Sequence, residues 1–228
     1  MYPGSLIVRT YDWWTRYRYL DICAVETGAL QRGLVGREVD ELCVRQMRFG
    51  DYFALDNIRR RNHEWLQPWD ATAPSDYPTF VPTTCELAWQ QAKDIRYGRT
   101  VPLIIEVDGQ PVGQITVLGI TRAAAHYAML GYWIDRQWAN CGVMTAALAM
   151  TMDVCMTDLQ LHRIEINIRP DNRRSLRVVE KLGLSYEGHR KKFLHVNNEW
   201  YDHECFAITA EVYPQRGLVA ELERIRGE

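Results

Sequence analysis

Alternating apolar and polar residues, typical of half-buried strands, occur at residues 41–48, and denser apolar runs follow further along the chain. Two of these runs, 100–109 and 110–120, are joined by Asp108-Gly109, a dipeptide that favours tight hairpin turns. They therefore predict a β-hairpin. The remaining expected strands are 125–135, 162–170 and two within 184–213 that meet near Asn197-Asn198.

Helical patterns separate these strands. Asp51 is expected to cap a helix that runs to about residue 66, and a second helix is expected over 86–96, after a proline-rich loop. The segment after Gly142 is expected to be a helix whose buried face is a single apolar stripe. Asp171 or Asn172 is expected to cap a last helix, which Gly183 would close in the left-handed conformation. The stripe consists of Val143, Ala147, Met150 and Val154.

The predicted order is one strand, helices, three strands, helix, strand, helix and two strands. This order indicates a mixed α/β fold in which an antiparallel meander leads into a β-α-β core. Residues 1–40 show no sustained period, so we treat them as an N-terminal extension that either caps the site or forms a dimer contact. The main domain is expected over 41–213, followed by a tail at 214–228 in which a helix is an option.

Composition narrows the class of protein only slightly. A formal charge of −2 gives no reason to expect a nucleic-acid partner, and no stretch is long and apolar enough to span a membrane. The six cysteines are scattered without a C-x-x-C pair, which indicates reduced thiols in a cytoplasmic protein. His162 and His189 have no second ligand at metal spacing, so no metal site is expected.

The turn at residues 136–142 connects an expected strand to an expected helix. A helix N-terminus presents unpaired N–H groups and partial positive charge, which suits a phosphate group. Asn140 and Gly142 tolerate the left-handed conformation that lets a main chain approach a ligand closely. Neither G-x-G-x-x-G nor G-K-S/T is present. On spacing alone, the segment is either a plain strand-to-helix turn or a phosphate-binding loop of another kind.

Several motifs resemble the GNAT superfamily of N-acetyltransferases, and within it the RimJ/RimL-type ribosomal-protein N-terminal acetyltransferases. The acetyl-CoA loop of that family reads Q/R-x-x-G-x-G/A, and residues 137–142 match its first and last positions. Its later helix reads N-x-x-S-x-x-V-x-E-K-x-G, which residues 172–183 match throughout. Residues 59–74 resemble its substrate-side helix and loop. The resemblance extends over about residues 41–213.

This resemblance implies the GNAT fold: a mixed, twisted central sheet with an antiparallel N-terminal meander, flanking helices and splayed central strands. It also implies acetyl-CoA as co-substrate, with pantetheine paired to the main chain near Trp133 and the diphosphate held by amides at 140–145. Asn140 and Cys141 replace the usual Gly and Arg or Lys, which we expect to weaken CoA binding. The cofactor-binding residues expected are Trp133, Ile134, Gln137, Asn140, Cys141, Gly142, Val143, Met144, Thr145, Asn172 and Ser175.

The resemblance leaves alternatives open for several of the catalytic and substrate-binding residues. Many members carry a tyrosine as general acid where Val179 stands here, so Ser175 is the hydroxyl expected to meet the leaving thiolate. Glu165 and Glu64 are alternative general bases, and a water chain that needs neither is a third option. Trp65 and Trp69 are expected either to wall the acceptor site or to pack the helix-loop corner, and Asn172 either to bind pantetheine or to cap its helix.

Three functions follow in order of preference. The first is acetyl transfer to the N-terminal α-amine of a protein, with a ribosomal protein as the favoured acceptor. The second is the same chemistry on a small-molecule amine. The third is a non-catalytic acyl-CoA-binding module, which the departures at Asn140, Cys141 and Val179 would suit.

Overall fold

A computed structural model describes residues 7–8, 21–25, 39–48, 50–74, 93–94 and 97–227. The described residues form one nine-stranded sheet in the order β1-β2-β3-β4-β5-β6-β7-β9-β8. Its strands are β1 (Ile7–Val8), β2 (Asp21–Val25), β3 (Glu41–Gln46), β4 (Val101–Val107), β5 (Gln110–Thr121), β6 (Tyr127–Ile134), β7 (Arg163–Ile168), β8 (Ser185–Val196) and β9 (Glu199–Thr209). The helical elements are α2 (Asp51–Arg61), α3 (His63–Leu66), η1 (Gln67–Trp69), η2 (Arg136–Trp138), α5 (Val143–Thr157), α6 (Arg173–Lys181) and α7 (Leu218–Gly227).

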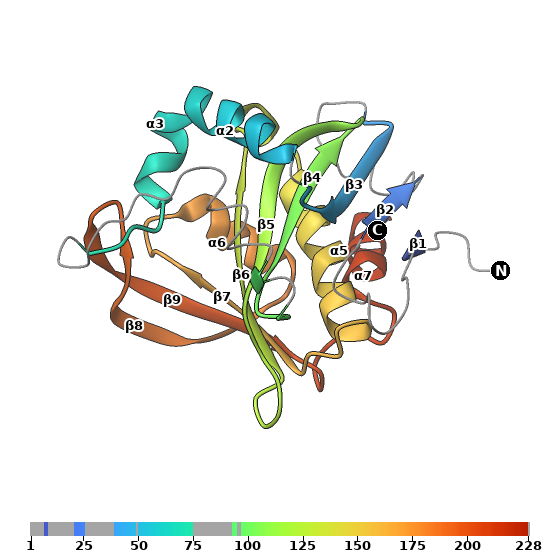
Figure 1. The fold of residues 1–228 in the computed structure, drawn as a ribbon. Coiled ribbons are helices and arrows are strands. Elements are labelled where there is room, and N and C mark those ends of the chain that lie inside the picture. Colours follow the sequence, from blue (N-terminus) through green and yellow to red (C-terminus); the bar gives the residue numbers. More distant parts are fainter. Residues whose placement is uncertain are drawn as a thin grey trace.

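The sheet is mixed and splayed at its centre, which confirms the predicted fold class. Neighbouring strands are antiparallel except for β6 and β7, which run parallel. That parallel pairing joins Tyr127–Met129 to Arg163–Glu165, whereas β6 continues to Ile134 and β7 to Ile168. The two strands therefore separate beyond Met129, and a gap opens in the middle of the sheet (Figure 1).

Helices cover both faces of the sheet because the strand period of two sends alternate side chains to opposite sides. On β4, Leu103 and Ile105 belong to the large core that includes α5, α6 and α7. Ile104, between them, packs with Leu55 and Ile58 of α2 in a second, smaller cluster. Figure 1 shows α2 and α3 together on one side, away from α5 and α7.

Both expected hairpin turns are confirmed. Asp108 and Gly109 have φ values of 50° and 71°, and Asn197 and Asn198 have φ values of 46° and 65°. Positive φ at both central residues gives a turn whose twist matches that of paired strands, which is why Gly and Asn occupy these positions.

The caps of α6 are also as expected. Of the two alternatives, Asn172 is the N-cap, and its side-chain oxygen accepts the Ser175 N–H at 3.2 Å. Gly183 follows the helix with φ of 68°, the left-handed conformation that satisfies the last carbonyl groups.

The single apolar stripe expected on the helix after Gly142 was wrong. In α5, all residues from Val143 to Cys155 are buried, polar Thr151 and Asp153 included. The helix is enclosed because the sheet lies on one side and α7 packs on another. Asp153 accepts N–H groups from Leu218 at 2.7 Å and Val219 at 3.1 Å, which fixes the start of α7 against α5.

The cap expected at Asp51 was also wrong, because Gly50 is the N-cap and Asp51 is the first helical residue. Its carboxylate forms two 2.7 Å bonds with the Arg45 guanidinium and accepts the Arg48 N–H. Burial raises the Asp51 pKa, but these bonds outweigh burial and hold it below its usual value. The helix also ends earlier than expected, at Arg61.

The expected helix at 86–96 lies outside the described residues except for 93–94, as does most of the extension 1–40. Two short segments of that extension, β1 and β2, continue the sheet beyond β3 in antiparallel pairing. None of the described helices is both long and apolar enough to cross a membrane.

Candidate active site

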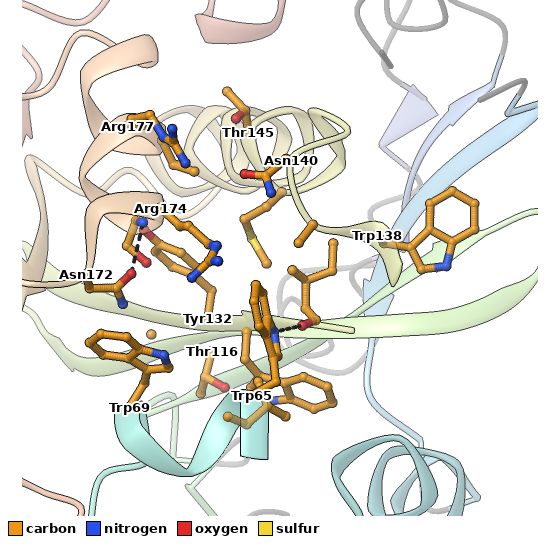
Figure 2. A pocket seen from close by; sticks show the side chains of 18 of the residues that line it. Trp65, Trp69, Thr116, Tyr132, Trp138, Asn140, Thr145, Asn172, Arg174 and Arg177 are labelled. Atoms are coloured by element: carbon orange, nitrogen blue, oxygen red, sulfur yellow. Dashed lines mark hydrogen bonds between the residues drawn. The ribbon is translucent and has the colours of Figure 1, made fainter. Parts of the chain in front are cut away.

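A cavity of about 380 Å³ occupies the gap where β6 leaves β7 (Figure 2). Its floor is β5 and β6, and its walls are α3 and η1, the turn before α5, the first turn of α5, and α6. Ten of the sequence-predicted site residues line it: Trp65, Trp69, Trp133, Ile134, Asn140, Gly142, Met144, Thr145, Asn172 and Ser175.

The turn before α5 adopts the left-handed conformations that the sequence indicated. Asn140 has φ of 60° and Gly142 has φ of 87°. The Ala146 N–H donates to the Gly142 carbonyl, so the N–H groups of residues 143–145 have no carbonyl four residues earlier within the helix. The first turn of α5 contains no acidic residue. Its amides and partial positive charge are therefore available to an anion in the cavity.

Buried polar residues hold this turn against α2. Asp135, 3% exposed, accepts the Gln137 main-chain and side-chain N–H groups, each at 3.1 Å, and forms an ion pair with Arg61. The Asn62 side chain accepts the Arg136 N–H at 3.0 Å and donates to the Ile58 carbonyl. These long-range bonds fix the position of the turn relative to α2.

The main chain of β6 is open toward the gap at alternate residues. The Asp135 N–H donates to the Val112 carbonyl on β5, so the main-chain groups of Trp133 also face β5. Those of Tyr132 and Ile134 therefore face the gap, and an extended ligand would pair there. The Trp65 indole N–H donates to the Ile134 carbonyl at 3.1 Å and occupies that acceptor. Trp133 lines the cavity, and its indole N–H donates to the Gln114 side chain at 3.1 Å.

Two tryptophans of α3 and η1 line the cavity, and an arginine stacks on each. The Arg174 guanidinium lies 4.4 Å from the Trp65 ring centroid, across the cavity from α3. Arg169 stacks on Trp69 at 4.9 Å and on Tyr201 at 3.7 Å, and donates to the Pro68 carbonyl at 2.8 Å. Trp65 and Trp69 thus line the cavity, and the contacts of Arg169 also pack the helix-loop corner. Whether the two tryptophans face the acceptor stays a prediction.

Four of the lining residues that were not predicted from the sequence bear on the chemistry of the site. Three are cations of α6, Arg174, Arg177 and Lys181, spaced along one helical face. Their spacing of three and four residues, shared with Ser175 and Val178, was the signal that could have found them. The fourth is Tyr132, whose place next to Trp133 gave no indication of which side chain faces the cavity.

Glu165 lies outside the cavity lining and is 3% exposed. Its carboxylate accepts bonds from Arg190 at 2.7 Å, Asn167 at 2.8 Å and Arg163 at 3.1 Å. Burial raises the Glu165 pKa, but these three donors outweigh burial and hold the pKa below its usual value. A carboxylate held ionised by two arginines suits a structural ion pair better than proton transfer in the cavity.

Glu64, the other expected base, is exposed and also absent from the lining. Three predicted cofactor residues do not line the cavity with their side chains. Gln137 bonds Asp135, the Cys141 thiol donates to the Ala139 carbonyl at 3.4 Å, and Val143 is fully buried. Any contact of these three with a ligand would be through the main chain.

A family profile described as "Acetyltransferase (GNAT) domain" matches residues 41–185, more than half of the chain. The chain belongs to the GNAT family. It is an N-acetyltransferase with acetyl-CoA as the acetyl donor. The mixed sheet with splayed β6 and β7 is the fold of its structural neighbours.

Three relatives show how closely this acetyltransferase matches known proteins. Mycobacterium smegmatis RimJ, solved in complex with CoA-disulfide, is 35% identical, with a TM-score of 0.73 over 81% of this chain and 89% of that one. The ribosomal protein uS5-alanine N-acetyltransferase of Escherichia coli is 27% identical over 75% of this chain and 88% of its own. The L-amino acid N-acetyltransferase AaaT of Escherichia coli is 28% identical over 72% and 95%. This acetyltransferase spans 56% of the length of a further relative, the probable N-acetyltransferase YjcK of Bacillus subtilis.

Proposed function

We propose that this acetyltransferase acetylates the N-terminal α-amine of a protein, with ribosomal proteins as the first acceptors to test. The scarcity of bases in the cavity carries the proposal. Among the described lining residues only Asp70 has a carboxylate, and Arg59 binds it at 2.6 Å. A peptide α-amine, with a reference pKa of about 7.7–8.0, is partly neutral near pH 7 without a base, whereas a lysine amine near 10.4 is not. The uS5 relative is named for an alanine of a ribosomal protein, which supports an acceptor of this kind.

Different residues would bind different parts of acetyl-CoA. The amides of residues 140–145 and the helix dipole would hold the diphosphate, with Arg177 and Lys181 supplying the positive charge that Cys141 does not. The main-chain groups of Tyr132 and the N–H of Ile134 would pair with pantetheine, as an added strand pairs with a sheet edge. Asn172 caps α6 and so fixes Ser175 at the cavity wall.

In the transfer step, the neutral amine nitrogen attacks the thioester carbonyl carbon. The carbon–nitrogen bond forms, the carbon–sulfur bond breaks, and the sulfur leaves with the electron pair as a thiolate. Ser175 would donate a hydrogen bond to that sulfur. The proton of the attacking amine would pass to solvent through the cavity mouth, so neither Glu165 nor Glu64 is assigned a role in this step.

The test is the release of free CoA thiol from acetyl-CoA with a panel of acceptors. Peptides with free N-termini that copy ribosomal-protein sequences should be turned over, and the same peptides blocked at the N-terminus, with a lysine retained, should not. Mass spectrometry should place the acetyl group on the α-nitrogen. Turnover of the blocked peptides, or turnover confined to small amines, would contradict the proposal.

A small-molecule acceptor is the second candidate, because the relative AaaT is named for L-amino acids. Free amino acids and polyamines therefore belong in the same panel, compared with peptides by kcat/KM. A non-catalytic acyl-CoA-binding role would show as calorimetric binding of acetyl-CoA without turnover of any amine. We also expect a cytoplasmic protein and a homodimer, to be checked by fractionation and by light scattering.

A further inference from the structure

Arg174 directs a guanidinium group from the first turn of α6 into the cavity, toward Trp65 on α3 (Figure 2). The central carbon of that group lies 4.4 Å from the centroid of the Trp65 ring. The ring itself is held on β6, because its indole N–H donates to the Ile134 carbonyl at 3.1 Å. A contact between two walls of the cavity therefore places the guanidinium at the tryptophan end.

Among the described residues, no carboxylate pairs with Arg174 and no side chain or carbonyl accepts a hydrogen bond from its guanidinium. The one described carboxylate in the cavity lining is that of Asp70, which Arg59 binds at 2.6 Å. A guanidinium stacked on a ring keeps its five N–H donors at the edge of its own plane, outside the stack. Arg174 can therefore bind a carboxylate with two parallel hydrogen bonds while it stays on Trp65.

The stability of α6 does not explain an arginine at this position. A cation in the first turn of a helix is disfavoured, because that end of the helix dipole is positive. The first turn of α6 contains no acidic residue that would offset the charge of Arg174. In the free enzyme this exposed arginine gains a ring contact and no ion pair with any described residue. Its charge is therefore available to a ligand.

Two kinds of anion can enter this cavity, the phosphate groups of CoA and a carboxylate of the acceptor. Arg177 and Lys181, about one and two helical turns beyond Arg174, also line the cavity and are assigned to the diphosphate. Of these three cations, Arg174 is the one for which the structure shows a contact with the tryptophan end. This division favours a carboxylate of the acceptor as the partner of Arg174.

We propose that Arg174 is a specificity-determining residue: it binds an acidic side chain at the second or third residue of the N-terminus that is acetylated. The inference rests on the proposed function and on the prediction that Trp65 and Trp69 face the acceptor. The charge of Arg174 also acts on the amine, because a nearby cation disfavours the protonated form. The neutral, attacking amine is thereby favoured, and an acceptor with a basic residue near its N-terminus is rejected.

The experiment compares kcat/KM for peptides that begin with alanine and differ at the second residue alone, which is glutamate, glutamine or lysine. A second set carries the same three residues at the third position. In at least one set, the wild-type enzyme should prefer glutamate to glutamine about tenfold and turn over the lysine peptide least. Arg174→Gln should reduce the preference for glutamate to within about twofold. Arg174→Lys, which keeps the charge but loses the planar pair of donors, should retain part of it.

Arg173→Gln is the matched control, since it removes the same charge from the neighbouring residue, which is exposed and outside the cavity lining. It should keep the wild-type preference. An equal loss of preference in Arg173→Gln and Arg174→Gln would assign the effect to the overall charge of the surface and overturn the inference. The second measurement is acetyl-CoA affinity by calorimetry, which Arg174→Gln should leave unchanged. A loss of that affinity with the peptide preference intact would assign Arg174 to the co-substrate and also overturn it.

A comparison of alanine with alaninamide separates this inference from the proposed function. If peptides are turned over without a preference for glutamate, only the role of Arg174 is overturned. If no peptide is turned over, but alanine is preferred to alaninamide and Arg174→Gln removes that preference, the proposed function fails. In that case Arg174 still binds a carboxylate, and the carboxylate belongs to a free amino acid.

Discussion

The two ends of the cavity are built from different parts of the chain. The end at α5 is made by the main chain: left-handed residues at 140 and 142 and the unpaired amides of a first helical turn. The end at α3 and η1 is made by side chains, Trp65 and Trp69, which Arg174 and Arg169 hold from α6 and from the end of β7. A main-chain site depends on backbone conformation, and a side-chain site depends on which side chains meet.

This difference indicates how the two ends can vary. Any thioester of CoA presents the same diphosphate and pantetheine, which a main-chain end can hold without specific side chains. The acceptor differs between relatives, and a wall of aromatic rings stacked on arginines can be altered one residue at a time. We therefore expect substitutions at the turn to change CoA affinity and substitutions at the wall to change acceptor affinity.

Gly142→Val should have the largest effect. With φ of 87°, a valine here adopts a left-handed conformation that costs about 1–2 kcal/mol, and its branched side chain occupies space next to the unpaired amides. We expect affinity for acetyl-CoA to fall about 100-fold, measured by calorimetry. Gly109→Val is the matched control, because it brings similar strain at φ of 71° to a hairpin outside the cavity lining. Unchanged binding in Gly142→Val would remove the diphosphate assignment.

The sequence predicted the backbone of the main-chain end and the two tryptophans of the side-chain end, but not the arginines that hold these tryptophans, for a physical reason. Asn140, Gly142, Asn172 and Gly183 act through local backbone conformation, which neighbouring residues determine. Arg169 and Trp69 meet across 100 positions of sequence, and no local pattern encodes that contact. The identity of the general base stays a prediction, because the surroundings of Glu165 also depend on contacts with residues distant in the sequence, such as Arg190.

The enclosure of α5 was also not predictable from its own residues. The spacing of the apolar residues along the helix suggested one apolar face. The helix is instead covered by the sheet and by α7, whose position depends on Asp153. Its small residues, Ala146, Ala147 and Ala149, are fully buried and allow close packing on several sides. The fold class was easier to predict than the enclosure of α5, because it required only the order of strands and helices.

Glu165→Gln tests whether acetyl transfer needs the Glu165 carboxylate on β7. We expect kcat/KM to stay within about twofold and the free energy of unfolding at pH 7 to fall by about 2 kcal/mol, because Arg163 and Arg190 lose their shared partner. Since the folded-state pKa of Glu165 is depressed, its contribution is present above the unfolded value of about 4.3 and is lost as pH falls through the folded value. Urea unfolding at pH 7 and below pH 4 should show the difference between the two proteins narrowing. If Glu165→Gln loses much of its kcat but keeps the wild-type stability, Glu165 would be supported as the general base.

Arg169→Met should affect the acceptor end alone. The methionine retains an apolar stem but loses the stacking on Trp69 and Tyr201 and the bond to the Pro68 carbonyl. We expect KM for the acceptor to rise about tenfold, equivalent to about 1.4 kcal/mol, with acetyl-CoA affinity unchanged. Arg190→Met is the control, since Arg190 also stacks on a ring, Phe193 at 4.7 Å, but Phe193 does not line the cavity, whereas Trp69 does. An equal rise in both variants would assign the effect to general loosening of the sheet.

Asn140→Gly should have the smallest effect and is the sharpest test of the main-chain end. At φ of 60°, glycine adopts the same backbone without strain, so an end that works through amides should bind acetyl-CoA as well as before or up to about threefold more tightly. Asn197→Gly, at φ of 46° in the β8–β9 turn, controls for the added freedom of the unfolded chain. A loss of affinity beyond tenfold at Asn140 alone would show that its side chain contacts the co-substrate. In that case the Asn140 side chain would bind the co-substrate directly. Both ends of the cavity would then use side chains to bind their ligands, and the contrast between them would be smaller.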